Sequence, residues 1–472
     1  MKVFTSKKVL TVIALACACF TAHAQESLTV ITEAGKLATH IPEAKKYQIT
    51  DLKVTGEING TDILLLRQMA GKGLQVSDKT EGKLTSLDLS EVRIVEDGDN
   101  YCAIKQGLST KFYKPTKKDA IPPYMFYKLN QLTKIQLPIS IKKIDKFALT
   151  GCTALTECAI PENVTSIGDY AFASCEKLTT MTFPSALEEI GAHVFEGCSA
   201  LTTLSEFPQT LTDIGENAFY KTAVTAFSVS EENEDYAAFD GVLYNKELTS
   251  LIAYPTGSTS TTVQFPAEIA DIEANAFAYA RNLKSIVLPE GLTNIGESAF
   301  AYSGLTHITS LASGLSIKEQ AFTGCADLVS VNFKGAVSGI DNKAFFGANK
   351  LAVVHFAGTG IPEFGASVFT AFRTQLSIYV PAEVITRFKD ALVKKSVVLG
   401  SRYDVLDITT SDIKTANQLY NASESVRYDL NGNRLSAPAK GINILKLSNG
   451  KVIKRVEKGV SLILEYDYLY SC

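Results

Sequence analysis

Four cysteines occupy the same place in a repeating sequence pattern, and thiols are side chains that could bind a metal or perform redox chemistry. They lie three residues after a recurring aromatic or aliphatic residue, at Cys152, Cys175, Cys198 and Cys325. Stacked repeats would bring them to equivalent corners, either as a metal or redox site or as a row of buried free thiols. Because the chain has no CxxC motif and no cluster of Cys and His, we predict buried thiols.

The remaining cysteines do not form a recognisable site either. Cys158 takes an inward strand position and is expected in the core, whereas Cys102 and Cys472 fall outside the repeat and are free to be exposed. The spacing is uneven, which does not fit a disulfide framework.

Motifs for other chemistry are missing from the sequence. It contains no HExxH, no GxSxG and no Gly-rich phosphate loop. Asp429 to Asn433 resembles the start of a calcium loop, but position six is not Gly and position twelve is Lys440, so a turn is favoured. We therefore predict no catalytic residue, no metal site and no cofactor.

An anchor residue recurs about every 23 positions and indicates a repeat architecture. The anchors are Phe126, Leu149, Phe172, Phe195, Phe219, Val242, Phe277, Phe300, Phe322, Phe345 and Phe369. An Ile usually precedes the anchor by five residues, Ala often precedes it directly, and L-x-x-I-x-L-P often follows. In that segment the first, fourth and sixth side chains point inward, and Pro ends the strand. A single coil cannot bury its own apolar face, so the coils must stack.

One spacing, from Val242 to Phe277, is 35 residues long. We interpret Leu248 to Pro255 as an ordinary first strand, followed by a polar loop over 256–262 and an added strand over 263–266. The array is then unbroken from about 121 to 381. Insertions in repeat proteins often fall on one face, so 256–266 is either a binding feature or a tolerated insertion.

The combined pattern L-T-x-I-x-L-P…V-x-x-I-G-x-x-A-F-x-x-C resembles the BspA-like leucine-rich repeat family of bacterial surface proteins over about 121–381. The resemblance implies a solenoid, export and, in some members, adhesion to host matrix proteins or to other bacteria. The expected fold is a β-rich solenoid, a leucine-rich repeat array of short strands and turns. It is capped by an irregular N-terminal region and a C-terminal helix, and is followed by a small C-terminal β module.

The first 24 residues are typical of a secretion signal. Three lysines precede an apolar stretch from Val9 to Phe20, and Ala22-His23-Ala24 fits a cleavage site, so we expect a secreted or outer-surface protein cleaved near Ala24. Cys17 and Cys19 allow a lipoprotein, although they fit that signal poorly. No other stretch is long enough to span a membrane. Removal of 1–24 takes away three lysines and no acid, which changes the formal charge from −4 to −7 and argues against nucleic acid as a partner.

The flanking regions complete the predicted domain organisation. Residues 25–118 form an N-terminal cap with irregular coils, in which 62–70 is helical and 96–118 is an exposed loop. Residues 119–400 form the solenoid with a capping helix over 382–392. Residues 401–423 are a linker, and 424–472 form a small module of hairpins around Asn-Gly turns. We expect a monomer.

Outward positions of the first strands are the predicted ligand-binding surface. They are small and rich in hydroxyl groups, and lack an aromatic ladder or a charged stripe. The candidates are Thr180, Thr182, Thr203, Ser205, Ser285, His307, Ser330, Asn332 and His355. His307 and His355 lie two coils apart, too far to bind one metal easily.

Three functions remain open from the sequence. The favoured one is a non-catalytic adhesin or binding module for a host matrix protein, another surface protein or a glycan. The others are a structural envelope protein without a ligand, and an enzyme with a site in a flanking region.

Overall fold

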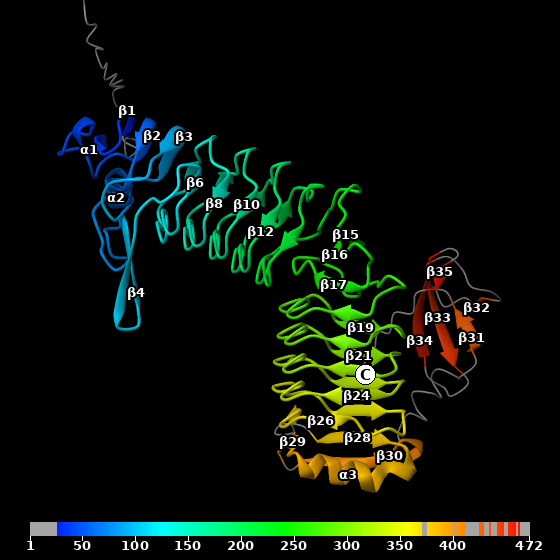
Figure 1. Cartoon of the computed structure of the whole chain (residues 1–472). Coiled ribbons are helices and arrows are strands. Elements are labelled where there is room, and N and C mark those ends of the chain that lie inside the picture. The colour runs from blue at the N-terminus through cyan, green and yellow to red at the C-terminus, as the bar shows by residue number, and fades with distance from the viewer. Residues whose placement is uncertain are drawn as a thin grey trace, which may run out of the picture.

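The computed structural model describes residues 26–370, 375–400 and 402–410, together with five strands between 424 and 462. The predicted signal peptide, Cys472 and the calcium-like segment 429–433 lie outside the described residues. Figure 1 shows the described chain as an elongated stack of coils that changes direction near its middle. The β-rich solenoid predicted from the repeat is confirmed.

The N-terminal cap continues the sheet of the first coils. Strands β1 (Ser27–Thr32), β2 (Asp51–Ile58) and β3 (Ser86–Ile94) pair in parallel, and β3 continues into the first repeats. The helical pattern near 62–70 corresponds to α2 (Gly60–Met69), which begins with a capping box between Asn59 and Asp62. A four-residue helix, α1 (Leu37–His40), packs beside it.

The segment 96–118, expected as an exposed loop, contains an antiparallel hairpin. Its strands are β4 (Cys102–Gln106) and β5 (Ser109–Tyr113). The tip, which includes Leu108, is exposed, but Tyr101 and Cys102 at the base are fully buried. The expectation that Cys102 could be exposed is therefore wrong, because the base of the hairpin closes the open end of the first coil.

The regular coils of the first array alternate between two rows of short parallel strands. One row contains β7 (Lys134–Gln136), β9 (Glu157–Ala159), β11 (Thr180–Met181) and β13 (Thr203–Leu204). The other contains β6 (Ala120–Ile121), β8 (Lys143–Ile144), β10 (Ser166–Ile167), β12 (Glu189–Ile190) and β14 (Asp213–Ile214). Anchors of successive coils stack between the rows, as in Phe172 on Phe195 at 5.6 Å between ring centroids.

The corner around each anchor carries a second ladder of hydrogen bonds. Amide groups two residues before the anchor, at the anchor and two residues after it donate to carbonyls of the next coil. Tyr170, Phe172 and Ser174 illustrate it, with N···O distances of 2.9, 3.0 and 2.7 Å. The residue two before the anchor has positive φ in these coils, for example 57° at Tyr170. In the corners at Leu149, Phe172 and Phe195 the acceptors are the carbonyls three before, one before and one after the next anchor.

The array breaks where the sequence spacing is long. Strands β15 (Tyr236–Phe239), β16 (Val242–Asn245) and β17 (Ser250–Ala253) form an antiparallel meander. Strand β17 pairs with β18 (Asp271–Ile272) in the row that contains the Ile positions, so Leu248 to Pro255 is not an ordinary first strand as expected. Val242 is part of this meander, and the anchor is Tyr254. It lies 23 residues before Phe277 and stacks on it at 4.8 Å between ring centroids.

Residues 256–266 differ from the prediction as well. The segment 263–266 is not a strand; instead 260–266 fills the place of the coil's first strand, and the amides of Lys284 and Ser285 both donate to Thr261 O. The expectation of an unbroken array is wrong, because the buried side chains form two separate clusters that meet near residues 242–244. Figure 1 shows the two arms on either side of β15, β16 and β17.

The second array repeats the regular geometry. Its first-strand row contains β19 (Ser285–Leu288), β21 (His307–Ser310), β23 (Ser330–Phe333), β25 (Val353–Phe356) and β28 (Leu376–Val380). The other row contains β18, β20 (Asn294–Ile295), β22 (Leu315–Ile317), β24 (Val337–Ile340) and β26 (Glu363–Phe364). All pairs within these rows are parallel.

The C-terminal end of the array is closed by helix α3 (Ile385–Lys394), which follows a short 3-10 turn (Ala382–Val384). Phe388 and Leu392 of α3 are buried against the last coils. The amide of Phe369 donates to Val397 O, and β27 (Phe369–Thr370) pairs with β29 (Val398–Leu399). Strand β30 (Tyr403–Asp407) then pairs with β28, so the sheet extends into the segment predicted as a linker, because Val405 supplies one more inward side chain.

The predicted C-terminal module contains an antiparallel sheet. Its strands are β31 (Glu424–Tyr428), β32 (Arg434–Leu435), β33 (Gly441–Leu447), β34 (Val452–Lys458) and β35 (Ser461–Leu462), in the order β32-β31-β33-β34-β35. Strands β33 and β34 form the longest hairpin, as the alternating pattern on either side of Asn-Gly predicts.

Candidate functional site

The nine predicted surface residues fall into two groups on two different sheets. Thr180 and Thr203 are direct neighbours on β11 and β13, and Thr182 is exposed beside them. Ser205 is half-buried, and its Oγ accepts a hydrogen bond from Phe183 N at 2.9 Å. The first group is therefore a small hydroxyl surface, part of which already serves the fold.

The second group follows the first-strand row of the second array. Ser285, His307 and Ser330 are paired across β19, β21 and β23. Asn332 is paired with His355 on β25, and His355 with Tyr379 on β28. Because parallel strands are about 4.8 Å apart, these side chains form two parallel lines with that period.

The two histidines of this row differ in environment. His307 is exposed, and its Nδ1 lies 2.9 Å from Thr306 Oγ1. His355 stacks on Tyr379 at 4.8 Å between ring centroids. Burial and then the nearby charge of Lys334 lower the pKa of His355 to about 4, so it is neutral at pH 7. Strand β23 separates the two, and the described residues contain no group of three metal-ligating side chains.

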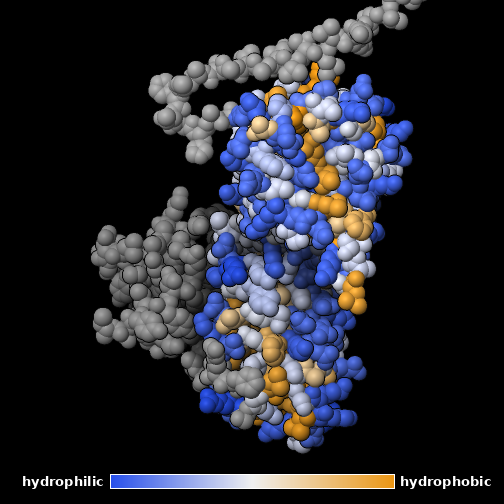
Figure 2. All heavy atoms as spheres, turned by 90° about the vertical axis from the view of Figure 1, so that its left-hand side faces the viewer, coloured by the Kyte–Doolittle hydropathy of each residue, from blue (hydrophilic) through white to orange (hydrophobic). Residues whose placement is uncertain are grey.

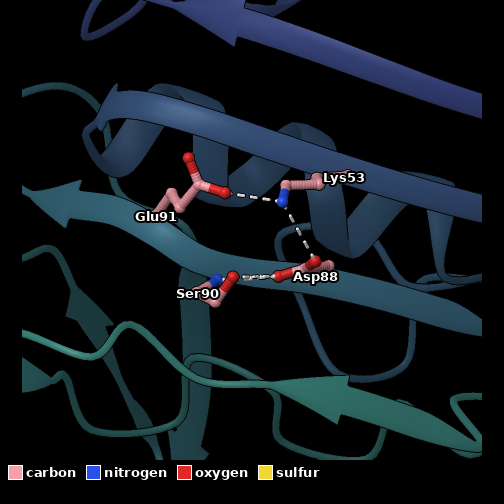
Figure 3. A network of polar contacts seen from close by, with 4 residues as sticks. All are labelled: Lys53, Asp88, Ser90 and Glu91. Atoms are coloured by element: carbon pink, nitrogen blue, oxygen red, sulfur yellow. Dashed lines mark hydrogen bonds and ion pairs between the residues drawn. The ribbon is translucent and has the colours of Figure 1, made fainter.

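Towards the N-terminal cap the outward face becomes charged. Figure 3 shows Lys53 of β2 between two carboxylates of β3, with Nζ 2.6 Å from Glu91 Oε1 and 3.7 Å from Asp88 Oδ2. Ser90 Oγ donates to Asp88 Oδ1 at 2.6 Å. The hydrogen bond to Glu91 and the neighbouring carboxylates raise the pKa of Lys53. The charges of these residues are therefore paired across β2 and β3, with one lysine facing two carboxylates.

The four corner cysteines are buried, as predicted. Their Sγ atoms donate to corner carbonyls of the preceding coil, for example Cys152 to Phe126 O at 3.1 Å. Burial raises the pKa of Cys152 to about 12 and that of Cys325 to about 11, so these thiols are not nucleophiles at neutral pH. They serve the packing of the corners.

An aromatic ladder that was not predicted from the sequence lies at the corners of the first array. The rings of Tyr124, Phe147, Tyr170 and His193 stack at 4.9, 4.9 and 4.5 Å between centroids. Because the rings cover one another's faces, mainly their edges are left for a ligand, which is unsuited to sugar stacking. On the side that Figure 2 displays, hydrophobic residues form narrow lines between hydrophilic ones rather than one broad patch.

A pocket of about 250 Å³ lies between the two arrays, and the sequence interpretation missed it. We call it the junction pocket; it is lined by residues 214–221 of the last regular coil, by Tyr236, by 252–254 and Thr256, and by 273–276 and Ala278 of the next corner. Lys221 lies 5.0 Å from the ring centroid of Tyr220 and 5.1 Å from that of Tyr279. The pair Ala253-Tyr254, which matches the Ala–anchor pattern, is the sequence signal that would have located it.

The rows of parallel strands and the two hydrophobic clusters define a repeat protein built from two leucine-rich solenoid arrays. The BspA type leucine rich repeat region matches residues 119–242 and 254–380 in six copies. The chain belongs to this family, and the interval between the two matched regions coincides with the meander of β16 and β17. Proteins of this family and fold are typically not catalytic.

Several solved structures are similar to the chain. The pneumococcal vaccine antigen PcpA is 22% identical, with a TM-score of 0.45, over 65% of this chain and 87% of that one. A leucine-rich repeat protein from Eubacterium ventriosum is 25% identical, with a TM-score of 0.43, over 55% and 74%. A leucine rich cell surface protein from Faecalibacterium prausnitzii is 22% identical, with a TM-score of 0.40, over 64% and 86%. No curated protein matches the chain.

Proposed function

We propose that this chain is an exported, non-catalytic leucine-rich repeat protein that binds a protein or glycan partner at the bacterial cell surface. The carrying observation is the first-strand row of the second array. It presents Ser285, His307, Ser330 and Asn332 in register on a rigid parallel sheet. Solenoids use such extended faces for recognition, because each coil adds one set of side chains at a fixed spacing.

Membership of a family that includes surface proteins supports the location. Among the described residues, no helix has the length and apolar character needed to cross a membrane. The signal-like segment 1–24 supports export, with cleavage after Ala24. Mass spectrometry of the mature N-terminus, together with protease shaving of intact cells, tests both. A protein that keeps residues 1–24, or that shaving does not reach, would contradict the proposed location.

The binding role is tested by a screen of the chain against host matrix proteins and a glycan array. The variant carries His307→Ala, Ser330→Ala and Asn332→Ala together. These side chains are exposed or half-buried, so the fold should be retained. The matched control carries Thr180→Ala, Thr182→Ala and Thr203→Ala in the first array. We expect a partner whose binding is lost in the first variant and retained in the second.

Two results would overturn this proposal. Complete absence of binding in the screen would favour a structural envelope protein. Equal loss in both variants would show that the second array has no special role.

A further inference from the structure

The junction pocket lies where the corner ladder of hydrogen bonds stops. In the preceding coil, His193, Phe195 and Gly197 donate to the carbonyls of Glu216, Ala218 and Tyr220 at 2.9, 2.8 and 2.9 Å. The equivalent donors of the next coil are the amides of Asn217, Phe219 and Lys221. These three amides have no acceptor among the residues that the structure describes.

The two arrays separate at the corner but stay joined on the other side of the coil. Thr256 Oγ1 donates to Thr222 O at 2.8 Å, and Gly257 N donates to Val224 O at 2.8 Å. A side chain at Gly257 would place its Cβ 2.0 Å from Ala223 O, so only Gly permits this approach. The junction is a wedge, closed at Gly257 and open at the three free amides.

The pocket also offers an acceptor and a charge preference. Asn217 Oδ1 is buried without a hydrogen-bond partner in the described part of the chain. The exposed side chains of Glu216 and Glu273 belong to the lining, against the single cation Lys221. Three amides alone would suit an anion, but two carboxylates beside them favour a neutral or basic ligand.

The spacing of the amides identifies the ligand class. Donors on alternate residues are met in the regular coils by carbonyls on alternate residues of the next corner. An extended chain also presents carbonyls of alternate residues along one edge, so it can supply the same acceptors. A volume of about 250 Å³ accommodates a few small residues but no bulky side chains. We propose that the junction pocket binds an extended segment of a partner protein, with small residues at its centre and basic residues beside them. This inference rests on the proposed binding function and adds to it a peptide site at the corner, separate from the first-strand row.

The test uses the full chain and a fluorescein-labelled peptide, Lys-Ala-Ser-Ala-Lys with blocked ends, measured by fluorescence anisotropy. Ala274 is exposed and lines the pocket, so Ala274→Trp should fill it. Ala366 has the same place in another coil, is also exposed and lies outside the pocket lining, so Ala366→Trp is the matched control. We expect Ala274→Trp to weaken binding about tenfold or more, and Ala366→Trp to leave it unchanged. The peptide Glu-Ala-Ser-Ala-Glu should bind more weakly.

A second measurement reports on the backbone donors themselves. Hydrogen exchange at Asn217, Phe219 and Lys221 should be faster than at Tyr170, Phe172 and Ser174, and the basic peptide should slow it. Slow exchange in the free chain, or no effect of the peptide, would overturn the proposal. The proposal would also be overturned if cellotriose bound to the chain, lost that binding in Ala274→Trp, and the peptide did not bind. If the chain binds a screened partner equally well with Ala274→Trp, the peptide site fails while the binding function stands.

Discussion

Arg67 Nη1 donates a hydrogen bond to Met125 O at 3.2 Å, although the two residues are 58 apart in sequence. The guanidinium thus takes the place of the amide donor that a preceding coil would supply. The same nitrogen donates to Tyr127 O, and Tyr101 Oη donates to Pro123 O at 2.6 Å. These are the carbonyls three before, one before and one after the anchor Phe126. They have no preceding regular coil, so two side chains of the cap satisfy them.

Arg67→Met should therefore destabilise the start of the array. Arg67 is fully buried, so its loss leaves two carbonyls without donors, at about 1–3 kcal/mol each. Removal of a buried charge offsets part of this, because burial itself lowers the pKa of Arg67. We expect a net loss of roughly 2 kcal/mol in urea unfolding. Arg93→Met, which removes an exposed partner of Glu57, is the control and should change stability little.

The two hydrophobic clusters should unfold with partial independence. Phe172→Ala and Phe322→Ala each remove a fully buried ring and should cost about 3–5 kcal/mol. Because Phe172 belongs to the first cluster and Phe322 to the second, faster hydrogen exchange should be concentrated in the array that carries the substitution. Equal acceleration across both arrays would show one cooperative core instead.

The pH dependence of stability should contain a contribution from His355. The pKa of His355 in the folded chain is about 4, below the ordinary 6.5. At pH 7 the side chain is therefore neutral in both the folded and the unfolded chain, and its full contribution to stability is present. As the pH falls from 6.5 towards 4, the unfolded chain takes up a proton that the folded chain does not, and stability decreases. Urea unfolding at pH 7 and pH 5 should show a smaller decrease for His355→Gln. The exposed His307 provides the comparison, and an unchanged slope in His355→Gln would refute the assignment.

The described cysteines should resist alkylation in the native protein. All six are buried, and burial raises the pKa of Cys152, Cys158 and Cys325. Iodoacetamide at pH 8 should leave these six unmodified, whereas the same reagent in guanidinium should modify them all. Peptide mapping by mass spectrometry reads out each site. Rapid native modification of a corner thiol such as Cys175 would mean that the corners open readily.

The regular coils were predictable because each is specified locally. Inward Ile and Leu positions, the Ala–Phe corner and the terminal Pro of the strand all act within about 23 residues. The two lines of outward residues follow from the alternation of side chains along a strand, so their placement in two rows was also accessible.

The junction was not predictable in the same way. Leu251 and its neighbours have a strand pattern, but alternation does not say which row the strand joins, and Leu251 pairs with Ile272. The hairpin of β4 and β5 was hidden by the polar, Lys-rich composition of the segment 96–118, although its buried base closes the first coil. The pocket itself arises because a corner is displaced from its neighbour, which depends on tertiary geometry rather than on any motif.

The corner ladder gives the solenoid a direction, because every amide donor points towards the following coil. One end of each array therefore presents only acceptors, as at Met125, and the other only donors, as at Phe369. A genetic duplication or deletion of one whole coil leaves both kinds of end unchanged. The number of coils can then vary in evolution without any alteration of Arg67 or of the helix α3 that closes the second array.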